Sequence, residues 1–545
     1  MKIFTNADFI SCEDDNRVFR TLIEDNGRIV HTGDTIPDNY ADCPVENLNS
    51  KCVVPAFADT HIHFESFSFF HSSLDCRTAS DFDELAGMIQ THRARSKEKL
   101  ILGFGCSAHS LREKRLPERA DLDTMTAHPL MIIKYDGHAA VANTALINKL
   151  PSGVLSDKGF DPKTGWFFHQ SYYHAVNHIS KSVSLFTVLK NLIAGSDYLA
   201  RKGIGLVHTA EGVGFPMDLD VDIMRLASLG LPQQYRTYFQ TMDVQKALRR
   251  NMPRIGGCFA TALDGCFGSE DAALTLPYNN NSNNRGVLFY TQTQVNAFVQ
   301  EANRAGLQVA MHAIGDAAVE QALIAYEHTM KDFPRSDHRH VLIHADLMTP
   351  ALIEKAASLG IAVALQTPFL YWPQEPVAYL ETILGNRMNQ LIPLKEPAAY
   401  LETLLGNRMD QLIPLRSMLK AGLLLGNGSD GPCTLPDPVL GIHAACNHPN
   451  PNERISAIDA LRMHTHWGAK LSFDEKERGT LTEGKAADFV VLDQNPLTVT
   501  IEKIKEIQIE ALYLNGTKYS GPHTGSTGLL MTCVRNKIKS LWRQA

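Results

Sequence analysis

The chain has 545 residues, of which 44% are hydrophobic and 20% are charged. These are ordinary proportions for a globular protein, and the chain is long enough to bury a large core. The formal net charge of −7 is mild, and no basic stripe with interleaved aromatic residues occurs, so phosphate-backbone binding is excluded as a leading function.

No run of 18 apolar residues occurs, and Asp8 interrupts the N-terminus before a secretory core could form. We therefore expect no membrane span and a cytoplasmic location. The ten cysteines are scattered without a C-x-x-C pair, which in a reducing compartment predicts buried thiols and no disulfide framework.

Both ends of the chain are rich in predicted strands. In residues 1–54, the runs 20–24 and 28–31 flank Asn26-Gly27, a strong hairpin signal. Residues 476–520 contain similar apolar runs. Two β-rich ends that flank an α/β middle predict a composite β-sandwich domain, formed by 1–54 together with 476–520.

The middle, residues 55–475, contains eight apolar runs that suit β-strands, most of them separated by amphipathic helical patterns. Repeated β-α units predict an α/β fold with a (β/α)8 TIM-like barrel. The eight runs are 53–59, 203–208, 235–239, 258–264, the three that end at His312, His344 and Gln366, and 423–430.

Three further segments stand apart from this pattern. The long interval between the first two runs predicts an inserted subdomain at 66–195. Residues 375–416 are a tandem repeat whose two copies differ at four of 21 positions, and each copy has the proline boundaries and apolar spacing of a short helix. We interpret the repeat as a tolerated surface insertion, with an altered lid or specificity wall as the alternative.

The C-terminal tail, residues 521–545, combines basic residues with an apolar stripe. We expect it to pack on the β domain or to fray, with association at a partner or membrane surface as the alternative. His338 and His340 lie in a charged stretch and are expected to face solvent.

Metal-ligand residues end several of the predicted strands. His61 and His63 are two apart, so on a strand both side chains point to the same side and can reach one ion. An H-x-H pair is weak evidence alone, but His312, His344 and Asp430 also end apolar runs. The C-terminal face of a (β/α)8 barrel collects such residues into one site.

Four segments in order carry a resemblance to a known family: PAFADTHIH, MHAIGDAAVEQAL, VLIHADLMTP with GSDGP, and GTLTEGKAADFVVLDQNP. Together they resemble the amidohydrolase superfamily, in the family 3 branch that includes N-substituted formamide deformylase-like proteins. The resemblance covers about residues 1–518 and implies a metal-dependent hydrolase. It also implies that His138, in the inserted subdomain, and Asp264, after the fourth strand, approach the substrate.

Such a hydrolase needs a Lewis acid that lowers the pKa of water and a base that takes its proton. We expect His61, His63 and His312 to bind the metal through neutral imidazole. Asp430 is expected to touch the metal and to accept the proton. His344 is a ligand in two-metal members of the superfamily and a polariser of the scissile carbonyl in one-metal members.

The number of ions follows from the fourth strand. Two-metal members usually bridge their ions with a carboxylated lysine or an acid there, but Ala260 stands at the expected position. We therefore expect one ion, zinc with iron or manganese as alternatives. Cys258 and Asp264 are outside candidates for a second ion, and Cys258 is expected to belong to the core.

The absence of a glutamate soon after His312 narrows the possible substrate class. Ring deaminases with this metal pattern carry a glutamate shortly after the strand-five histidine, whereas no glutamate follows His312 before Glu320. We expect hydrolysis of a small molecule with an acyclic amide, N-acyl or N-formyl group. The alternatives are a deaminase of an amino-substituted ring and a catalytically silent regulatory or binding protein. A homodimer is left open.

Overall fold

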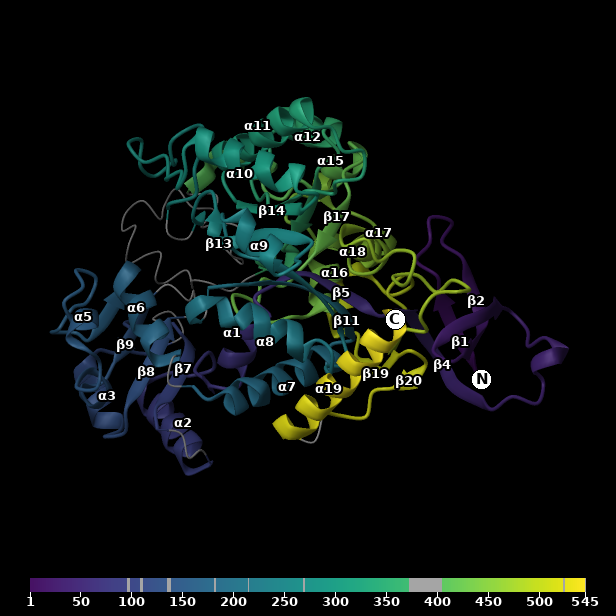
Figure 1. Ribbon diagram of the computed structural model, residues 1–545, viewed down its shortest axis with the longest axis horizontal. Coiled ribbons are helices and arrows are strands. Elements are labelled where there is room, and N and C mark those ends of the chain that lie inside the picture. The colour runs from purple at the N-terminus through teal and green to yellow at the C-terminus, as the bar shows by residue number, and fades with distance from the viewer. Residues whose placement is uncertain are drawn as a thin grey trace.

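The computed structural model describes residues 1–95, 99–107, 111–134, 139–180, 183–213, 215–267, 270–371, 404–522 and 525–544. Over these residues the chain forms three β-sheets, of eight, seven and five strands. The eight-stranded sheet lies at the centre in Figure 1, the seven-stranded sheet to its right and the five-stranded sheet to its left. This order places the barrel between two smaller units.

The central sheet is the expected barrel. Its neighbouring strands are parallel, and their order along the sheet is their order along the chain. The sheet closes where the amide of Asp430 donates to the carbonyl oxygen of His61, at 2.8 Å. The strands are β5 Phe57–Ile62, β11 Ile204–Glu211, β12 Gln234–Phe239, β13 Arg254–Ala262, β14 Gln308–Ala313, β15 Val341–His344, β16 Ala362–Leu365 and β17 Leu425–Asn427.

Helices that follow the strands cover the outside of the barrel. Local sequence starts several of them: Thr291 caps α10 in a capping box with Gln294, and Thr349 caps α12 just before Pro350. These helices are α8 Leu219–Ala227, α9 Val244–Arg249, α10 Gln292–Arg304, α11 Asp316–Asp332, α12 Pro350–Ser358, α15 Leu415–Lys420, α16 Pro438–Cys446, α17 Ala457–Met463 and α18 His466–Leu471.

The seven-stranded sheet joins the two ends of the chain, as expected. Its order is β20-β19-β18-β4-β1-β2-β3, and β4 pairs with the C-terminal strand β18 in antiparallel register. Asn26 and Gly27 are both left-handed, at φ 50° and 83°, which the two-residue turn between β2 and β3 requires. The strands are β1 Lys2–Ile10, β2 Val18–Asp25, β3 Arg28–Gly33, β4 Val45–Pro55, β18 Phe489–Leu492, β19 Ile509–Leu514 and β20 Thr517–Lys518.

The five-stranded sheet belongs to the insertion and has its own apolar clusters on its two faces. The predicted boundary at residue 195 falls inside α7 Leu185–Arg201, which packs on α1 Phe64–His71 and on β11 and so belongs to the barrel. The strands are β6 Leu74–Asp75, β7 Ile101–Cys106, β8 Leu130–Lys134, β9 Ala139–Ala142 and β10 Trp166–Phe168, and its longer helices are α2 Phe82–Arg95, α3 Arg119–Met125 and α6 His169–Ser180.

Two sequence features fall largely outside the described residues. His138 lies in the gap between 134 and 139. The first copy of the tandem repeat and the start of the second lie in the gap 372–403. The described end of the second copy contains the 3-10 helix Gly406–Gln411 and the first residues of α15.

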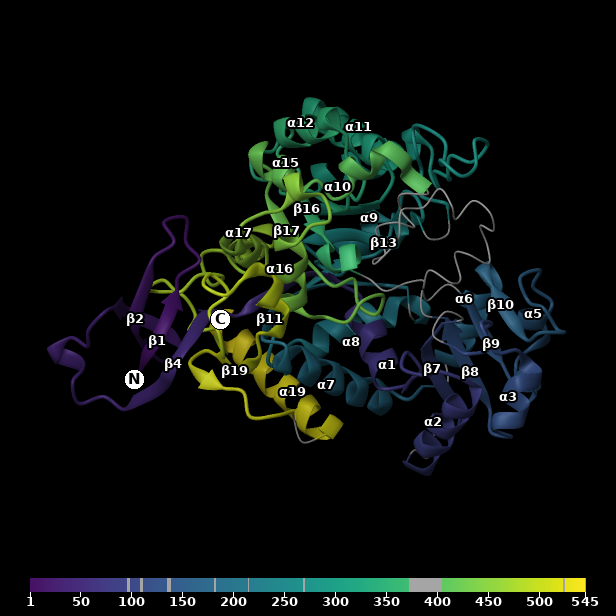
Figure 2. The same ribbon diagram turned by 180° about the vertical axis from the view of Figure 1, so that it is seen from behind.

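The C-terminal tail forms helix α19, Gly525–Gln544. This helix packs on α7 and α8, whereas we expected it to pack on the seven-stranded sheet. Both ribbon views show it beside α7 at the lower edge of the molecule (Figures 1 and 2). Leu529 and Cys533 are buried, so the apolar stripe finds its partner on the barrel helices. No helix within the described residues is long and apolar enough to cross a bilayer.

His338 and His340 are buried, so the expectation that they face solvent was wrong. The Nδ1 atom of His340 accepts a hydrogen bond from the amide of Val309 at 3.0 Å, and its ring stacks on Tyr326. The reason is their position beside the start of β15, where the barrel strands and α11 enclose them.

Candidate metal centre

Four barrel strands bring ligand-type side chains together, three of them at their C-terminal ends. His61 is near the end of β5, and His63 is the residue before α1. His344 is the last residue of β15, and Asp430 follows β17. Cys258, from the middle of β13, joins them. All five side chains are buried, at 2 to 7% exposure.

The ligand atoms are close to one another. One carboxylate oxygen of Asp430, Oδ1, lies 3.2 Å from Nε2 of His61 and 3.3 Å from Nε2 of His63. The sulfur of Cys258 lies 3.2 Å from Nε2 of His61 and 3.6 Å from Nε2 of His344. His61, Cys258, His344 and Asp430 each offer an atom within 4.8 Å of the others.

These separations fit a metal ion. Bonds of about 2.0–2.3 Å in tetrahedral geometry put neighbouring ligand atoms about 3.3–3.7 Å apart. The observed separations of 3.2 to 3.6 Å match this spacing. The Oδ1 atom of Asp430 is also buried without a hydrogen bond, which is costly unless another partner, such as a cation, binds it. The residues present therefore suit a divalent metal.

Neighbouring acceptors orient two of the imidazoles. The Nδ1 atom of His344 lies 2.6 Å from the side-chain oxygen of Gln366, so Nδ1–H donates and Nε2 keeps its lone pair. The Nδ1 atom of His63 lies 3.3 Å from the carbonyl oxygen of Ala210. Such partners fix the tautomer that a metal needs.

The protonation states of the clustered side chains suit metal binding. Burial lowers the pKa of His61 and holds that of His344 well below its ordinary value, so both are neutral at pH 7. Burial by itself raises the pKa of Asp430, but hydrogen-bond contacts with His61 and His63 hold it well below its ordinary value. An ionised carboxylate among neutral imidazoles can bind a cation without first losing protons.

His312 lies at the edge of this cluster. Its ring centre is 4.5 Å from that of His344, but its Nε2 atom faces the carbonyl oxygen of Gly265 at 3.3 Å. Asp264, 3.6 Å from the same nitrogen, accepts hydrogen bonds from three backbone amides of the loops after β13 and β14. Asp264 thus positions the His312 loop, and its contact with substrate stays a prediction.

Cys258 is the site residue that the sequence analysis placed in the core. The register of β13 against β14 shifts between Gly257 and Ala262, and Phe259 is left-handed at φ 43°. At this irregularity the sulfur of Cys258 lies beside two of the histidines, whereas the sequence analysis considered Ala260, four residues before Asp264, as the bridging position. Burial raises the pKa of the Cys258 thiol well above its usual range, so a thiolate there requires a metal.

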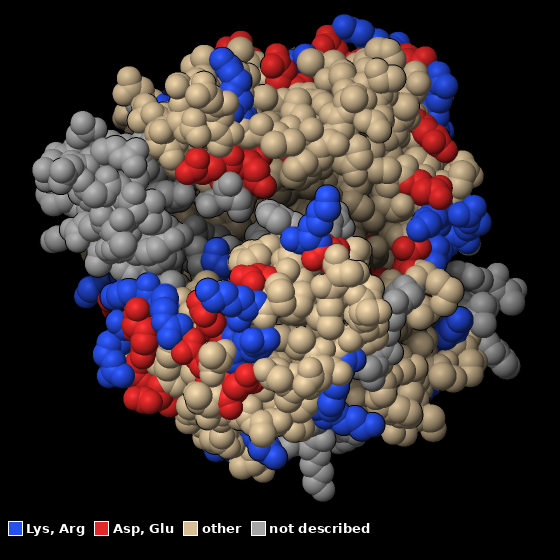
Figure 3. All heavy atoms as spheres, turned by 90° about the vertical axis from the view of Figure 1, so that its left-hand side faces the viewer, with Lys and Arg blue, Asp and Glu red and all other residues tan. Residues whose placement is uncertain are grey.

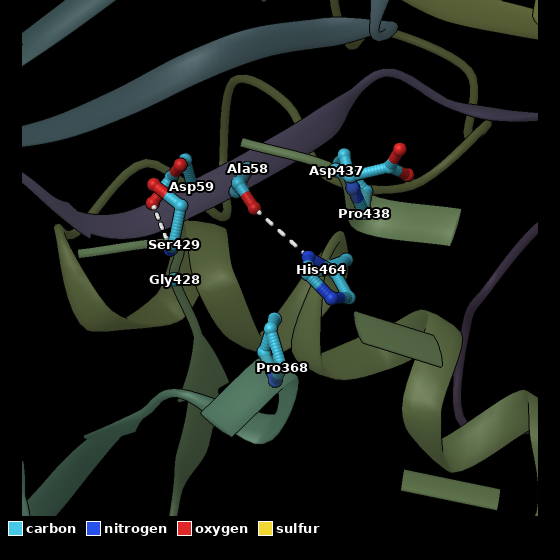
Figure 4. Close-up of a pocket in the computed structure, with 8 residues that line it drawn as sticks. All are labelled: Ala58, Asp59, Pro368, Gly428, Ser429, Asp437, Pro438 and His464. Carbon is cyan, nitrogen blue, oxygen red and sulfur yellow. Dashed lines mark hydrogen bonds between the residues drawn. The ribbon is translucent and has the colours of Figure 1, made fainter. Parts of the chain in front are cut away.

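Asp59 ties the two ends of the barrel sheet together beneath the centre. Its carboxylate accepts from the amides of Ser429 at 3.0 Å and His61 at 3.3 Å. Figure 4 shows Asp59 and Ser429 in a small cavity that His464 also lines, with Pro368 below. This bracing fixes the loop that carries Asp430 against the strand that carries His61.

Aromatic rings stand beside the ligands. Phe259 is 42% exposed and its ring centre is 4.9 Å from that of His63, while the ring of Phe369 is 6.0 Å from that of His344. The chain leaves β5 toward the left in Figure 1, and Figure 3 views that face, where a hollow lies between the barrel helices above and the insertion below. The centre therefore has partly apolar walls.

The barrel and this ligand set define a metal-dependent hydrolase. The family model described as the amidohydrolase family matches residues 45–164 and 255–518. A crystal structure of an uncharacterised metal-dependent hydrolase from Pyrococcus horikoshii superposes with a TM-score of 0.74 at 22% identity, covering 92% of this chain and 99% of that one. At that identity the likeness shows the fold.

Two relatives match nearly the whole chain. YtcJ of Bacillus subtilis, named as an amidohydrolase, is 25% identical over 95% of this chain and 99% of its own. The N-substituted formamide deformylase of Arthrobacter pascens is 23% identical over 94% of this chain and 96% of its own. The chain belongs to the amidohydrolase family.

Proposed function

We propose that the protein hydrolyses carbon–nitrogen bonds other than peptide bonds in a small acyclic amide, such as an N-formyl or N-acyl amine. The observation that carries this proposal is the buried cluster of His61, Cys258, His344 and Asp430 at the end of the barrel. The similarity to a formamide deformylase over almost the full length of both chains supports the substrate class.

Zinc suits the proposed ligands, which are the imidazoles of His61, His63, His312 and His344 and the carboxylate of Asp430. The sulfur of Cys258 lies between His61 and His344 and could bind a metal as a thiolate. We therefore add Cys258 to the proposed ligand set. Iron and manganese are the alternatives because imidazole and carboxylate also suit them. A bound metal supplies a Lewis acid that lowers the pKa of water and polarises the substrate carbonyl.

Asp430 is the proposed base. Its low pKa keeps the carboxylate ionised at neutral pH, and its position between His61 and His63 faces the ligand cluster. Its carboxylate would accept the proton of the attacking water and return it to the leaving amine nitrogen. The neutral Nε2 of His344 lies on the other side of the cluster, where it can bind a metal or contact the scissile carbonyl.

The structure around His312 favours an amide over a ring substrate. No glutamate stands between His312 and Gly315, and the carboxylate of the next residue, Asp316, already accepts hydrogen bonds from the backbone amide and the hydroxyl of Thr275. The leaving amine of an acyclic amide needs only one proton donor, which Asp430 supplies after it has served as base. Hydrolysis of an N-acyl or N-formyl amine therefore fits better than deamination.

The test measures metal content and hydrolysis in the same preparations. Purified protein, loaded with zinc, iron or manganese, is assayed on a panel of N-formyl and N-acyl amines, with the freed amine as readout. Asp430→Asn should lower kcat by about 10²–10⁴-fold while the fold is kept. His61→Ala should lose metal. A metal-loaded protein that releases no amine from any member of the panel, or only ammonia from ring substrates, would refute the amide proposal.

A further inference from the structure

Asp346 is held rigidly beside the centre. It follows His344 by two residues, and the chain turns there through two left-handed residues, His344 at φ 70° and Ala345 at φ 52°. At the end of β14, the carbonyl oxygens of Ala313 and Ile314 accept from the amides of Ala345 and Leu347, at 2.9 and 3.0 Å. The carbonyl oxygen of Asp346 accepts from the amide of Ile413 at 2.7 Å. Non-glycine residues keep such a backbone where the surrounding structure enforces it, often at functional sites.

The carboxylate of Asp346 is buried without a partner. The residue is 4% exposed, and its Oδ1 atom accepts no hydrogen bond. Within the described part of the chain, no lysine or arginine forms an ion pair with it. Burial, with a further contribution from the charge of Asp430, raises the pKa of Asp346 to about 7.

Three other buried carboxylates of this protein are fully paired. Asp264 accepts three backbone amides, Asp474 pairs with Arg236, and Asp488 pairs with Arg478 at 2.6 Å. Buried polar groups are nearly always hydrogen-bonded, and an unpaired buried carboxylate is strongly destabilising. Asp346 therefore differs from these three carboxylates, and its place next to His344 suggests that a bound molecule completes it.

We propose that Asp346 binds a protonated amino group of the substrate, so that the preferred substrates are N-formyl or N-acyl amines that carry a second, cationic amine. This inference rests on the proposed amide hydrolysis at the same centre. The aromatic rings of Phe259 and Phe369 beside His63 and His344 would contact the apolar part of such a molecule. A carboxylate paired with an ammonium group gives a short, charge-assisted hydrogen bond.

Two substrates of matched size test the proposal: N-formyl-1,4-diaminobutane, which is cationic, and N-formylpentylamine, which is neutral. With metal-loaded full-length protein, kcat/KM should favour the cationic substrate by about tenfold or more, since one buried charge pair contributes at least this much. Asp346→Asn should reduce that ratio at least tenfold. Glu354→Gln removes one negative charge from an exposed position on α12 and should leave the ratio as in wild type.

Binding of butylammonium, measured by calorimetry on the metal-loaded protein, tests Asp346 without turnover. If neither formamide is cleaved, the proposed hydrolysis fails, yet a tenfold weaker binding of butylammonium in Asp346→Asn would still support the cation site. Equal binding by wild type and Asp346→Asn, or an unchanged substrate ratio, would overturn the inference. Loss of metal from Asp346→Asn with an unchanged ratio would also overturn it, because Asp346 would then balance the charge of the metal.

Discussion

His344 shows how single residues prepare the centre. Its Nδ1–H donates to Gln366, its Nε2 faces Cys258, and its buried ring is neutral. The sequence marked His344 because it ends an apolar run, but Gln366 carried no signal of its own beyond ending the next run. The pair becomes visible only when β15 and β16 lie side by side.

Replacement of Gln366 tests this support. Gln366→Ala should weaken metal binding or lower kcat/KM by about 10–100-fold, because the imidazole of His344 loses the acceptor that fixes its tautomer. Metal titration and amine release measure the two effects. Gln245→Ala, at an exposed position on α9, is the matched control and should change neither quantity. A wild-type affinity and rate in Gln366→Ala would contradict the assignment.

His464 couples protonation to stability. Burial lowers the pKa of His464 to about 4, against about 6.5 in an unfolded chain. The stabilisation that depends on its neutral form is fully present above pH 6.5 and is lost progressively as the pH falls toward 4. Between pH 6.5 and pH 4 the free energy of unfolding of wild type should therefore fall by about 3 kcal/mol relative to that of His464→Gln, because glutamine cannot be protonated.

The measurement is the free energy of unfolding in urea, with a chelator present, for both proteins between pH 7.5 and pH 4. As the pH falls, wild type should lose stability relative to His464→Gln. His328→Gln, at an exposed position, is the control and should follow wild type. A difference that stays constant across this range would show that the protonation of His464 is not coupled to folding.

At the scale of elements, β13 and α19 departed from the expected pattern. Strict alternation would put Cys258 and Ala260 on the same face of β13, but Phe259 between them is left-handed and the register shifts there, and it is the sulfur of Cys258 that lies beside His61 and His344. Helix α19 has the expected amphipathic pattern, and only the fold decided that its apolar side meets α7 and α8. Periodicity predicts a face, and the neighbouring elements decide what covers that face.

The packing of α19 can be tested with two residues of one helix. Leu529 is fully buried, whereas Met531 is 71% exposed. Leu529→Ala should lower the free energy of unfolding by roughly 2–5 kcal/mol, because it leaves a cavity against the barrel helices. Met531→Ala should change it by less than about 0.5 kcal/mol. Equal effects of the two substitutions in urea denaturation would argue against this packing.

At the scale of the whole molecule, the two ends of the chain meet in one sheet, and β4 runs directly into the strand that carries His61. The ligands come from segments more than 360 residues apart, His61 and Asp430. A metal that joins them binds the native fold and not the unfolded chain, so it stabilises the whole barrel.

Removal of metal should therefore lower the unfolding temperature. With free metal at about 1,000 times its Kd, linkage contributes about 4 kcal/mol, which a chelator should abolish and added zinc should restore. His61→Ala should unfold at the same temperature with and without zinc. Differential scanning calorimetry measures both proteins, and a wild-type unfolding temperature that is independent of the chelator would refute a resident metal in this centre.

The sequence by itself determined the classes of structure and chemistry. Strand-like runs that alternate with helical patterns specified a barrel, and His61, His63, His344 and Asp430 could be named because side-chain direction on a strand and position at its end are local properties. The tertiary structure decided the rest. Cys258 joins the site through a distortion of β13, and Asp346 is unpaired because of what surrounds it. Contacts between distant segments depend on how the elements pack, which no local pattern encodes.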